Sequence, residues 1–200
     1  MKGLSVVLLL LMATSASSSA ADQGYYAFGD WGIFSFGNAP VDTSDGIRIG
    51  GGYNFNSYVG AEAGLTIVGW QNRNSNSIQF SPYTDQSLNA STEHIAVVGT
   101  IPLEHHRDLV AKLGWATTTL DYQYSLYGSG VQSVSGSGSA TKTNPMFGIG
   151  WQSAPDQQTR FYVQYENFGK ARMTVIYSNQ TSSTHDVSVA LISVGILHYF

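Results

Sequence analysis

Hydrophobic and polar residues alternate with a period of two along most of the chain. Within residues 59–68, for example, Val59, Leu65 and Ile67 share one face, whereas Glu62 and Thr66 share the other. This period is typical of a strand with one apolar face and differs from the period of about 3.6 that a helix shows. The alternation predicts eight strands, at residues 25–34, 47–55, 59–68, 95–101, 109–124, 147–151, 161–165 and 187–200.

The connections between these strands alternate between short and long. Short turns are expected near residues 54–57, 103–108 and 154–158, and long loops at residues 35–44, 69–91, 127–143 and 170–186. The long loops are rich in Ser, Asn, Gln, Thr and Gly, as solvated segments are. Short turns on one side and long loops on the other are typical of bacterial outer-membrane barrels. We therefore expect an all-β protein, an eight-stranded antiparallel up-and-down transmembrane β-barrel with both termini in the periplasm; a soluble β-sandwich is the alternative.

The first 21 residues have the features of a secretory signal peptide. A basic residue, Lys2, precedes an apolar core at residues 4–12, and a run of small residues at 13–21 offers a cleavage point after Ala20 or Ala21. The apolar core is far shorter than the roughly 20 residues that a helix needs to cross a bilayer. We expect residues 1–21 to be a signal peptide and residues 22–200 to form one outer-membrane β-barrel domain.

Composition supports a membrane protein and excludes several kinds of chemistry. Aromatic residues make up 12% of the chain, charged residues only 11%, and there are 22 glycines, which suits strands with a lipid-facing side. The absence of cysteine excludes disulfides, thiolate metal sites, cysteine nucleophiles and a lipid-modified cysteine. Without Lys2 the chain keeps 8 basic and 13 acidic residues, a net charge of −5, so nucleic acid is not an expected partner.

If the apolar face contacts lipid, the opposite face carries charges into the lumen. An eight-stranded barrel is just wide enough for side chains to fill, and buried charges are costly unless paired. We therefore expect a largely filled, salt-bridged lumen, with the pairing left open. Glycines at lumen positions either make room for long side chains or allow strand curvature. The predicted lumen charge network is Asp30, Arg48, Glu62, Lys112, Arg160 and Glu166, with neutral polar groups from His94, Gln152 and Gln164.

Aromatic residues gather near the predicted strand ends. This placement indicates the aromatic girdles found at both membrane surfaces, with stacked carbohydrate-binding aromatics as the alternative. The residues assigned to the girdles are Tyr25, Trp31, Tyr53, Phe55, Tyr58, Trp70, Trp151, Tyr162, Phe168, Tyr199 and Phe200.

Motifs for metal binding or catalysis are weak. His105 and His106 are adjacent, so in a strand or turn they point apart, and a polar turn explains them better than a metal site. A serine–histidine hydrolase on a barrel would need a matched pair on one strand face. The nearest approach is His185 and Ser188, where the spacing is three rather than the two seen in lipid A deacylases. We expect no catalytic residues, no metal and no cofactor.

Three segments resemble the outer membrane protein A barrel family: Gly51 to Leu65, Phe147 to Trp151 and Ser193 to Phe200. The resemblance implies an eight-stranded barrel of a Gram-negative outer membrane, with an interior salt-bridge network and insertion by the barrel-assembly machinery through the C-terminal strand. The chain ends at Phe200, so the periplasmic peptidoglycan-binding domain of larger members, and cell-wall tethering with it, are not expected. The assembly signal carried over by this resemblance is Ile192, Val194, Ile196, His198 and Phe200, in which histidine replaces the usual aromatic or aliphatic residue third from the end.

These observations favour a non-enzymatic, monomeric barrel with a structural and surface-interaction role. Its long loops would contact lipopolysaccharide, another cell or a host surface, because rigid scaffolds usually carry function on loops. Outer-membrane lipid and the assembly machinery are further expected partners. A narrow gated porin-like channel is the second hypothesis, and a lipid-modifying enzyme is the third.

Overall fold

A computed structural model describes residues 23–39, 43–68, 71–75, 83–103, 106–127, 134–153 and 158–200. The predicted signal peptide lies outside these residues. No helix among the described residues is long and apolar enough to cross a membrane.

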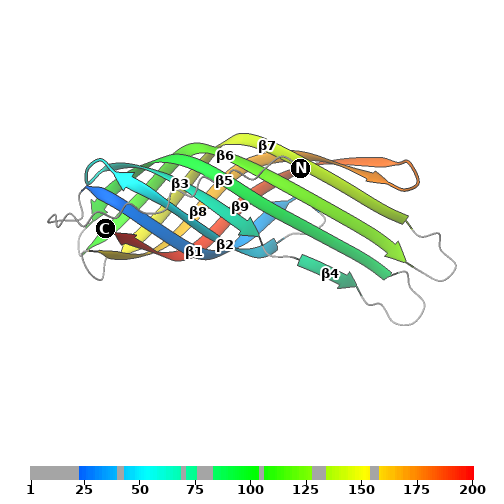
Figure 1. The fold of residues 1–200 in the computed structure, drawn as a ribbon, viewed down its shortest axis with the longest axis horizontal. Helices are drawn as coiled ribbons and strands as arrows, with labels where there is room; N and C mark the ends of the chain where they lie inside the picture. Colours follow the sequence, from blue (N-terminus) through cyan, green and yellow to red (C-terminus); the bar gives the residue numbers. More distant parts are fainter. Residues whose placement is uncertain are drawn as a thin grey trace.

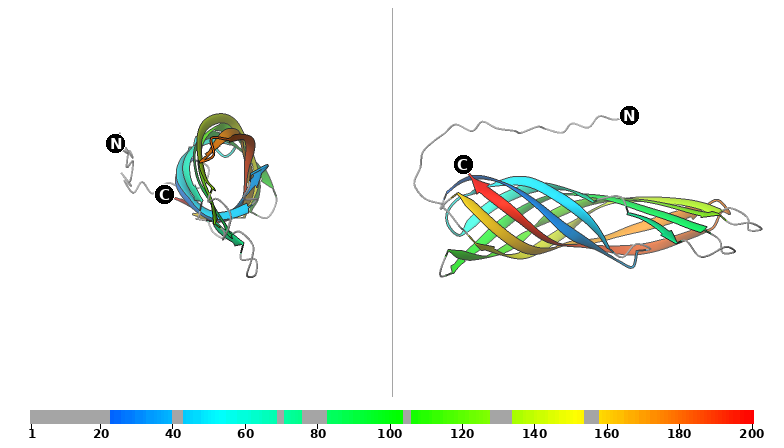
Figure 2. Two further views of the ribbon diagram at one scale, coloured as in Figure 1. Left: turned by 90° about the vertical axis from the view of Figure 1, so that its right-hand side faces the viewer. Right: turned by 90° about the horizontal axis from the view of Figure 1, so that it is seen from below.

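Antiparallel strands close into a ring, as Figures 1 and 2 show. The order around the ring is β3-β2-β1-β9-β8-β7-β6-β5, and pairing of β3 with β5 closes it. The short strand β4 pairs only with β5 and stands outside the ring. The predicted eight-stranded antiparallel barrel is thus confirmed. The strands are β1 (Gly24–Gly37), β2 (Thr43–Asn54), β3 (Val59–Val68), β4 (Gln71–Ser75), β5 (Tyr83–Leu103), β6 (Arg107–Tyr127), β7 (Val134–Ser153), β8 (Thr159–Tyr177) and β9 (Ser182–Tyr199).

The ring has two distinct ends. At the terminal end β1 begins and β9 stops, and the short turn at residues 55–58 joins β2 to β3. At the opposite, distal end, β8 turns into β9 at residues 178–181, and β4 lies toward this end in Figure 1. The strands cross the ring with a strong tilt, which closure of a barrel requires.

Several strands extend much further toward the distal end than the sequence predicted. Strands β5 and β6 contain 21 residues each, whereas about 9–11 tilted residues cross a bilayer. The segments 69–91, 127–143 and 170–186 were expected to be loops, and large parts of each are strand. Within residues 127–143, Ser, Thr and Gly residues hide the alternation, yet threonines pair across the strands: Thr117 with Thr143 (2.8 Å between hydroxyl oxygens) and Thr119 with Thr141 (3.2 Å).

The outer surface changes from apolar to polar along the strands. On β6 the outward side chains Leu113 and Trp115 are apolar and exposed, whereas the next outward residues, Thr117 and Thr119, are polar. An apolar exterior is required only where the wall contacts lipid, so this change marks one boundary of the membrane. The apolar belt consists of Trp31, Ile33, Ile47, Ile49, Ile67, Ile95, Val97, Ile101, Leu113, Trp115, Phe147, Ile149, Val163, Ile192, Val194 and Ile196.

The interior changes in the opposite sense. Toward the terminal end it holds charged and polar side chains, whereas toward the distal end it holds a packed apolar cluster, here called the distal core. A largely filled, salt-bridged lumen was predicted from the sequence, and the apolar character of the distal part has a physical reason: where the exterior meets water, the wall can be polar outside and bury apolar groups inside, like a soluble barrel. The distal core includes Phe34, Phe36, Val68, Leu88, Leu120, Tyr122, Met146, Phe168, Met173, Val175, Val187, Val189 and Leu191. Burial raises the pKa of Tyr122 to about 12.

A bulge in β8 adjusts which side chains point inward. The register with β9 shifts between Asn167 and Lys170, where Gly169 has a φ of +84°. Asn167 accepts a hydrogen bond from the Gly169 amide (2.9 Å). Because the bulge inserts an extra residue, both Phe168 before it and Ala171 after it lie in the distal core.

Lumen glycines make room for a side chain at one position and for a neighbouring backbone at another. A Cβ on Gly195 would lie 2.7 Å from the Tyr162 ring, so this glycine makes room for a side chain. A Cβ on Gly114 would instead meet the backbone of β5, 2.7 Å from the Ala96 Cα, so this glycine allows close approach of two strands.

Candidate functional site

Arg48 lies at the centre of the charged interior. Its side chain is only 1% exposed. Its Nε and Nη2 donate to one carboxylate oxygen of Asp30, at 2.8 and 2.7 Å, and its Nη1 donates to Glu166. Tyr162 donates to the same Asp30 oxygen at 2.5 Å. One guanidinium from β2 thus links carboxylates from β1 and β8, which are on different parts of the ring.

Lys112 connects a second carboxylate to this group. Its Nζ lies 2.7 Å from Glu62 Oε1 and 3.3 Å from Glu166 Oε1. Glu62 also contacts His94 Nε2 at 3.2 Å and accepts a hydrogen bond from the Tyr26 hydroxyl at 3.3 Å. All of these side chains are buried. The cluster is therefore an alternation of acids and bases across the barrel interior, in which each charge has an opposite charge within reach.

Ligand types for a metal come together in the same place. Single ligand atoms of Glu62, His94 and Glu166 lie within 4.8 Å of one another. The Lys112 ammonium already contacts both carboxylates of this trio. Because that ammonium stands where a cation would be held, the arrangement suits a fixed ion-pair network better than a metal centre.

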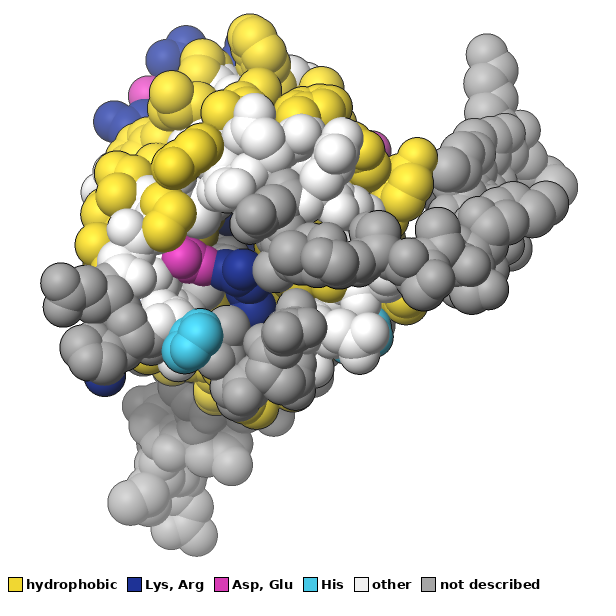
Figure 3. Space-filling model, turned by 90° about the vertical axis from the view of Figure 1, so that its left-hand side faces the viewer, with side chains coloured by type: hydrophobic (Ala, Val, Ile, Leu, Met, Phe, Trp, Pro, Cys, Tyr) yellow, Lys and Arg dark blue, Asp and Glu magenta, His cyan; other side chains and the backbone are white. Residues whose placement is uncertain are grey.

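The sixth predicted lumen charge, Arg160, lies nearer the terminal end and has a partner that sequence reasoning missed. Arg160 forms an ion pair with Asp108 and lies over the Tyr199 ring, 5.3 Å from its centroid. Asp108 had been placed in the turn beside the histidines, but it lies on the inward face of β6, four residues from Lys112. Residues an even number of positions apart on a strand point to the same face, so this spacing could have placed Asp108 on the inward face with Lys112. Figure 3 shows acidic and basic side chains side by side near the centre of the terminal end.

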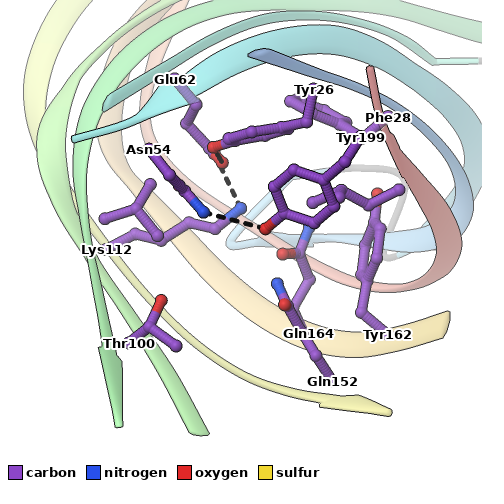
Figure 4. A pocket seen from close by; sticks show the side chains of 12 residues that line it. Tyr26, Phe28, Asn54, Glu62, Thr100, Lys112, Gln152, Tyr162, Gln164 and Tyr199 are labelled. Carbon is purple, nitrogen blue, oxygen red and sulfur yellow. Dashed lines mark hydrogen bonds and ion pairs between the residues drawn. The ribbon is translucent and has the colours of Figure 1, made fainter. Parts of the chain in front are cut away.

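A small cavity lies beside the charge network inside the barrel (Figure 4). It has a volume of about 20 Å³, which is room for about one water molecule. Lys112 and Glu62 border it on one side, and the rings of Tyr162 and Tyr199 border it on the other. Asn54 donates to the Tyr199 hydroxyl at 2.9 Å across its mouth.

The structure also shows where the predicted interior residues Gln152 and Gln164 lie, and which of the predicted girdle aromatics point outward. Gln164 is buried and donates to Ser193 (3.3 Å), and Gln152 borders the cavity. Three girdle assignments are wrong, because the side chains point inward: Tyr162, Phe168 and Tyr199 are buried. Trp70 lies outside the described residues, Tyr53 is half-buried, and the outward aromatics are Tyr25, Trp31, Phe55, Tyr58, Trp151 and Phe200.

The residues of the predicted assembly signal share one face of the last strand. Ile192, Val194, Ile196, His198 and Phe200 all point outward and are exposed. The His198 ring packs edge-on against Phe200, with 5.3 Å between ring centroids. Histidine at this position thus contacts the terminal aromatic instead of interrupting the face.

Among the described residues, neither the predicted histidine pair nor His185 has the set of partners that a metal site or a catalytic site requires. His105 lies outside these residues. Ser183, rather than Ser188, contacts His185, with 2.9 Å between Oγ and Nε2. The neighbouring carboxylate, Asp186, instead bonds Arg172 on the outer face (2.8 Å), so it does not orient the His185 ring.

An antiparallel ring with an apolar exterior belt and a buried charged interior is characteristic of integral outer-membrane β-barrels. The chain belongs to the outer membrane protein beta-barrel domain family, whose model matches residues 5–196. This confirms the predicted relationship to small barrels of the Gram-negative outer membrane. None of the curated proteins compared with the chain matches it.

Solved structures with the same fold cover nearly the whole chain. OprG of Pseudomonas aeruginosa has a TM-score of 0.60 and 11% identity, over 90% of this chain and 97% of OprG. Ail, the attachment invasion locus protein of Yersinia pestis, has a TM-score of 0.53 and 16% identity, over 90% of this chain and 99% of Ail. Neisserial surface protein A has a TM-score of 0.53 and 14% identity, over 92% and 100%. At these identities the likeness establishes the fold.

Proposed function

We propose that the protein is a non-enzymatic, non-conducting outer-membrane barrel that stabilises the membrane and uses its distal end for contacts outside the cell. One observation carries this proposal: two different barriers follow one another along the interior. The charge network around Arg48 crosses the barrel first, and the buried apolar side chains of the distal core lie beyond it. An ion entering from the terminal end would have to displace paired buried charges and then pass through packed apolar side chains.

The orientation follows from the same features. The terminal end would face the periplasm, because short turns and both chain ends of such barrels lie there. The distal half would then stand outside the membrane, where its polar wall meets water and its core keeps it rigid. Residues 1–21 would direct secretion, and the outward face ending at Phe200 would be read by the assembly machinery of the outer membrane. Ail, which shares this fold, has been solved with the heparin analogue sucrose octasulfate, which is consistent with external ligands for such barrels.

The refolded barrel is expected to be electrically silent in a planar lipid bilayer. Both the ion pairs and the distal core oppose passage of a hydrated ion. The measurement is single-channel recording on a preparation whose folding has been verified by its circular dichroism and by its heat-dependent shift in electrophoretic mobility. Steady discrete openings from such a preparation would refute the proposal.

A gated channel is the second candidate, and one observation favours it. Lys112 lies within reach of both Glu62 and Glu166, so an exchange of partners would require only a small movement. In that case openings should appear and Glu62→Gln should change their size or frequency. If the lumen is closed, Glu62→Gln should leave the recording silent.

We further propose that the outer wall binds the phosphate groups of lipopolysaccharide at two exposed cations. Lys170 and Arg172 lie on the outward face of β8, just beyond the apolar belt. The side-chain amide of Asn144 on β7 donates to the Lys170 carbonyl (3.0 Å), which holds the two strands together there. Within the described part of the chain, only Arg172 of the two has an ion pair, to Asp186, and this bond lowers the pKa of the Asp186 carboxyl.

Replacing these cations together with glutamine is expected to lower the lipopolysaccharide retained per barrel by about tenfold or more, since each basic residue near an anionic membrane surface contributes about 1 kcal/mol. The measurement is the phosphate and lipid A content of barrels purified from outer membranes. Arg107→Gln, which removes an exposed cation from the terminal end, is the matched control and should retain the wild-type amount. Equal retention by the double variant would show that the cations do not bind the lipid.

A further inference from the structure

Strand β9 has a free edge at the distal end. Strand β1 pairs with β9 only as far as Gly37, which lies opposite Ser188, whereas β8 and β9 stay paired up to Ile176 and Ser182. Among the described residues, no strand pairs with β9 residues 182–187 on the side away from β8. The hairpin of β8 and β9 projects at this end of the barrel in Figure 1. The described strands thus form a closed ring nearer the terminal end and leave one side of this hairpin unpaired.

The hydrogen-bond pattern shows which backbone groups lie on the free edge. At the tip of the hairpin the Tyr177 amide donates to the Thr181 carbonyl at 2.9 Å, so these two residues form a hydrogen-bonded pair. Bonded and non-bonded pairs alternate along an antiparallel ladder, and the register of β8 with β9 is continuous from this pair along the free edge. Every second residue of β9, beginning with Ser183, therefore bonds β8. The residues whose N–H and C=O groups point away from β8 are Ser182, Thr184 and Asp186.

The side chains beside these groups are held away from the edge. The Thr184 hydroxyl lies 3.1 Å from the Thr174 hydroxyl on β8. Asp186 accepts two hydrogen bonds from Arg172 on β8, at 2.8 and 3.3 Å, so its charge is paired. Lysine, proline and bulges usually protect edge strands from other chains. Residues 182–187 contain neither lysine nor proline, and the bulge of this pair of strands lies on β8, so the edge is open to a further strand.

The turn that closes the hairpin fixes the edge in place. The side-chain oxygen of Asn179 accepts hydrogen bonds from the Thr181 amide at 3.1 Å and from the Thr181 hydroxyl at 2.5 Å. The Gln180 amide donates to the Tyr177 carbonyl at 2.9 Å. The edge therefore already has the conformation of a paired strand, and pairing with another strand costs it little conformational entropy.

The two faces of the edge define the side chains of a strand that would pair with it. A strand docked antiparallel to β9 would continue the line of β1, whose inward side chains Phe34 and Phe36 lie in the distal core. Its inward residues would lie beside Val187, which is fully buried, and its outward residues beside Thr184, which is exposed. Apolar residues suit the first position and polar residues the second. A sugar or a lipid lacks the row of alternating donors and acceptors that such an edge pairs with.

A second copy of the chain in the same membrane does not match this edge with its own β9. Strands of such barrels tilt by about 35–45°. Two copies related by an axis along the membrane normal would have β9 strands that run in the same sense and cross at about twice that tilt, so no ladder would form between them. The edge is better suited to a flexible chain that can adopt the direction of β9.

We propose that the free edge of β9 binds an extended segment of another protein outside the cell, as an added antiparallel strand in which apolar and polar residues alternate. The inference rests on the proposed function, because such a partner reaches the edge only if the distal end faces outward. It adds the class of partner to that function and assigns the contact to the backbone groups of Ser182, Thr184 and Asp186.

Binding is measured on the whole barrel in lipid nanodiscs, with a fluorescent octapeptide of alternating valine and threonine as the probe. Saturable binding is expected. Thr184→Pro removes one N–H from the edge but none of the bonds to β8, and proline is tolerated where the N–H faces away from the sheet. It should weaken binding by about tenfold or more, through the lost hydrogen bond and the ring placed on the edge. Thr184→Ala keeps the backbone donor, so this matched control should bind the peptide as the wild type does.

A second comparison does not depend on the folding of a variant. The same peptide with N-methyl groups on successive amides is blocked along both of its edges and should not bind the wild type. Folding of each variant is checked by circular dichroism and heat-dependent mobility. Absence of binding to the folded wild type would overturn the proposal, as would equal binding by folded Thr184→Pro or equal binding of the methylated peptide.

Oligomers of the wild-type barrel that Thr184→Pro abolishes would also overturn the proposal, because a second copy would then occupy the edge. None of these results bears on the silent conductance on which the proposed function depends, so the two can fail separately.

Discussion

Replacement of Arg48 by methionine is expected to lower the free energy of unfolding by about 3–5 kcal/mol, the usual cost of removing one partner from a buried charge cluster. Methionine fills much of the space of the arginine side chain but leaves Asp30 and Glu166 without their shared cation. Both carboxylates lie where water is scarce, so the loss is the desolvation cost of unpaired charge and not merely a missing bond. The measurement is urea unfolding of barrels reconstituted in lipid vesicles, followed by tryptophan fluorescence.

Arg172→Met provides the matched control. Arg172 also pairs with a carboxylate, Asp186, at 2.8 Å, but both side chains are exposed on the outer wall. Exposed pairs contribute little, so this variant should unfold close to wild type. Asp30→Asn combined with Glu166→Gln in the Arg48→Met background removes the unpaired charge and should recover part of the loss. If Arg48→Met and Arg172→Met behaved alike, the interior network would not be a source of stability.

Leu113→Arg is expected to destabilise the barrel in the membrane by about 2–4 kcal/mol, the cost of a basic residue on the lipid face near the bilayer midplane. Leu113 points outward from β6 and is 69% exposed, in the middle of the apolar belt. Lys112, its neighbour, points inward and is paired with Glu62. A cation is therefore accommodated on one face of the strand and costly on the other.

Thr119→Arg tests where the membrane ends. Thr119 lies on the same outward face of β6, six residues nearer the distal end, in the part of the wall that the polarity change places in water. A surface substitution there should change stability by no more than about 0.5 kcal/mol. Both variants are compared with wild type by reversible unfolding from vesicles. An equal loss from Thr119→Arg would mean that the hydrocarbon extends over the distal wall and that the boundary is wrongly placed.

Much of the barrel is predictable from sequence because strand alternation is a local property. The two faces of residues 59–68 are read directly from the order of side chains, and β3 spans these same residues. The extended part of β7 was missed for an equally local reason: a serine-, threonine- and glycine-rich segment has no apolar face to reveal its period, and its strand character comes from backbone pairing with a neighbouring strand. The extended part of β8 does alternate, with Ala171, Met173 and Val175 inward, but the bulge at Gly169 shifts the inward positions by one residue and interrupts the period of the preceding residues.

Parity identified six of the interior charges but not Asp108, and it identified none of their contacts. Parity places Arg48 inside, yet only the ring brings Glu166 to it from 118 residues away. Asp108 was overlooked because it follows a turn, and Ser183 because its segment was taken for a loop. Each of these contacts depends on which strands are neighbours and in what register, and a two-residue period carries no information on either.

The sequence by itself determined the strand-forming pattern, the apolar exterior and six of the charges that face inward, since each depends on neighbours along one strand. Tertiary structure alone decided how those charges pair, that the distal interior is apolar and that Tyr124 and Tyr177, distant in sequence, lie edge to face toward the distal end. These features arise when the ring closes and the membrane boundary falls partway along the strands. The same alternating pattern then buries opposite kinds of side chain on the two sides of that boundary.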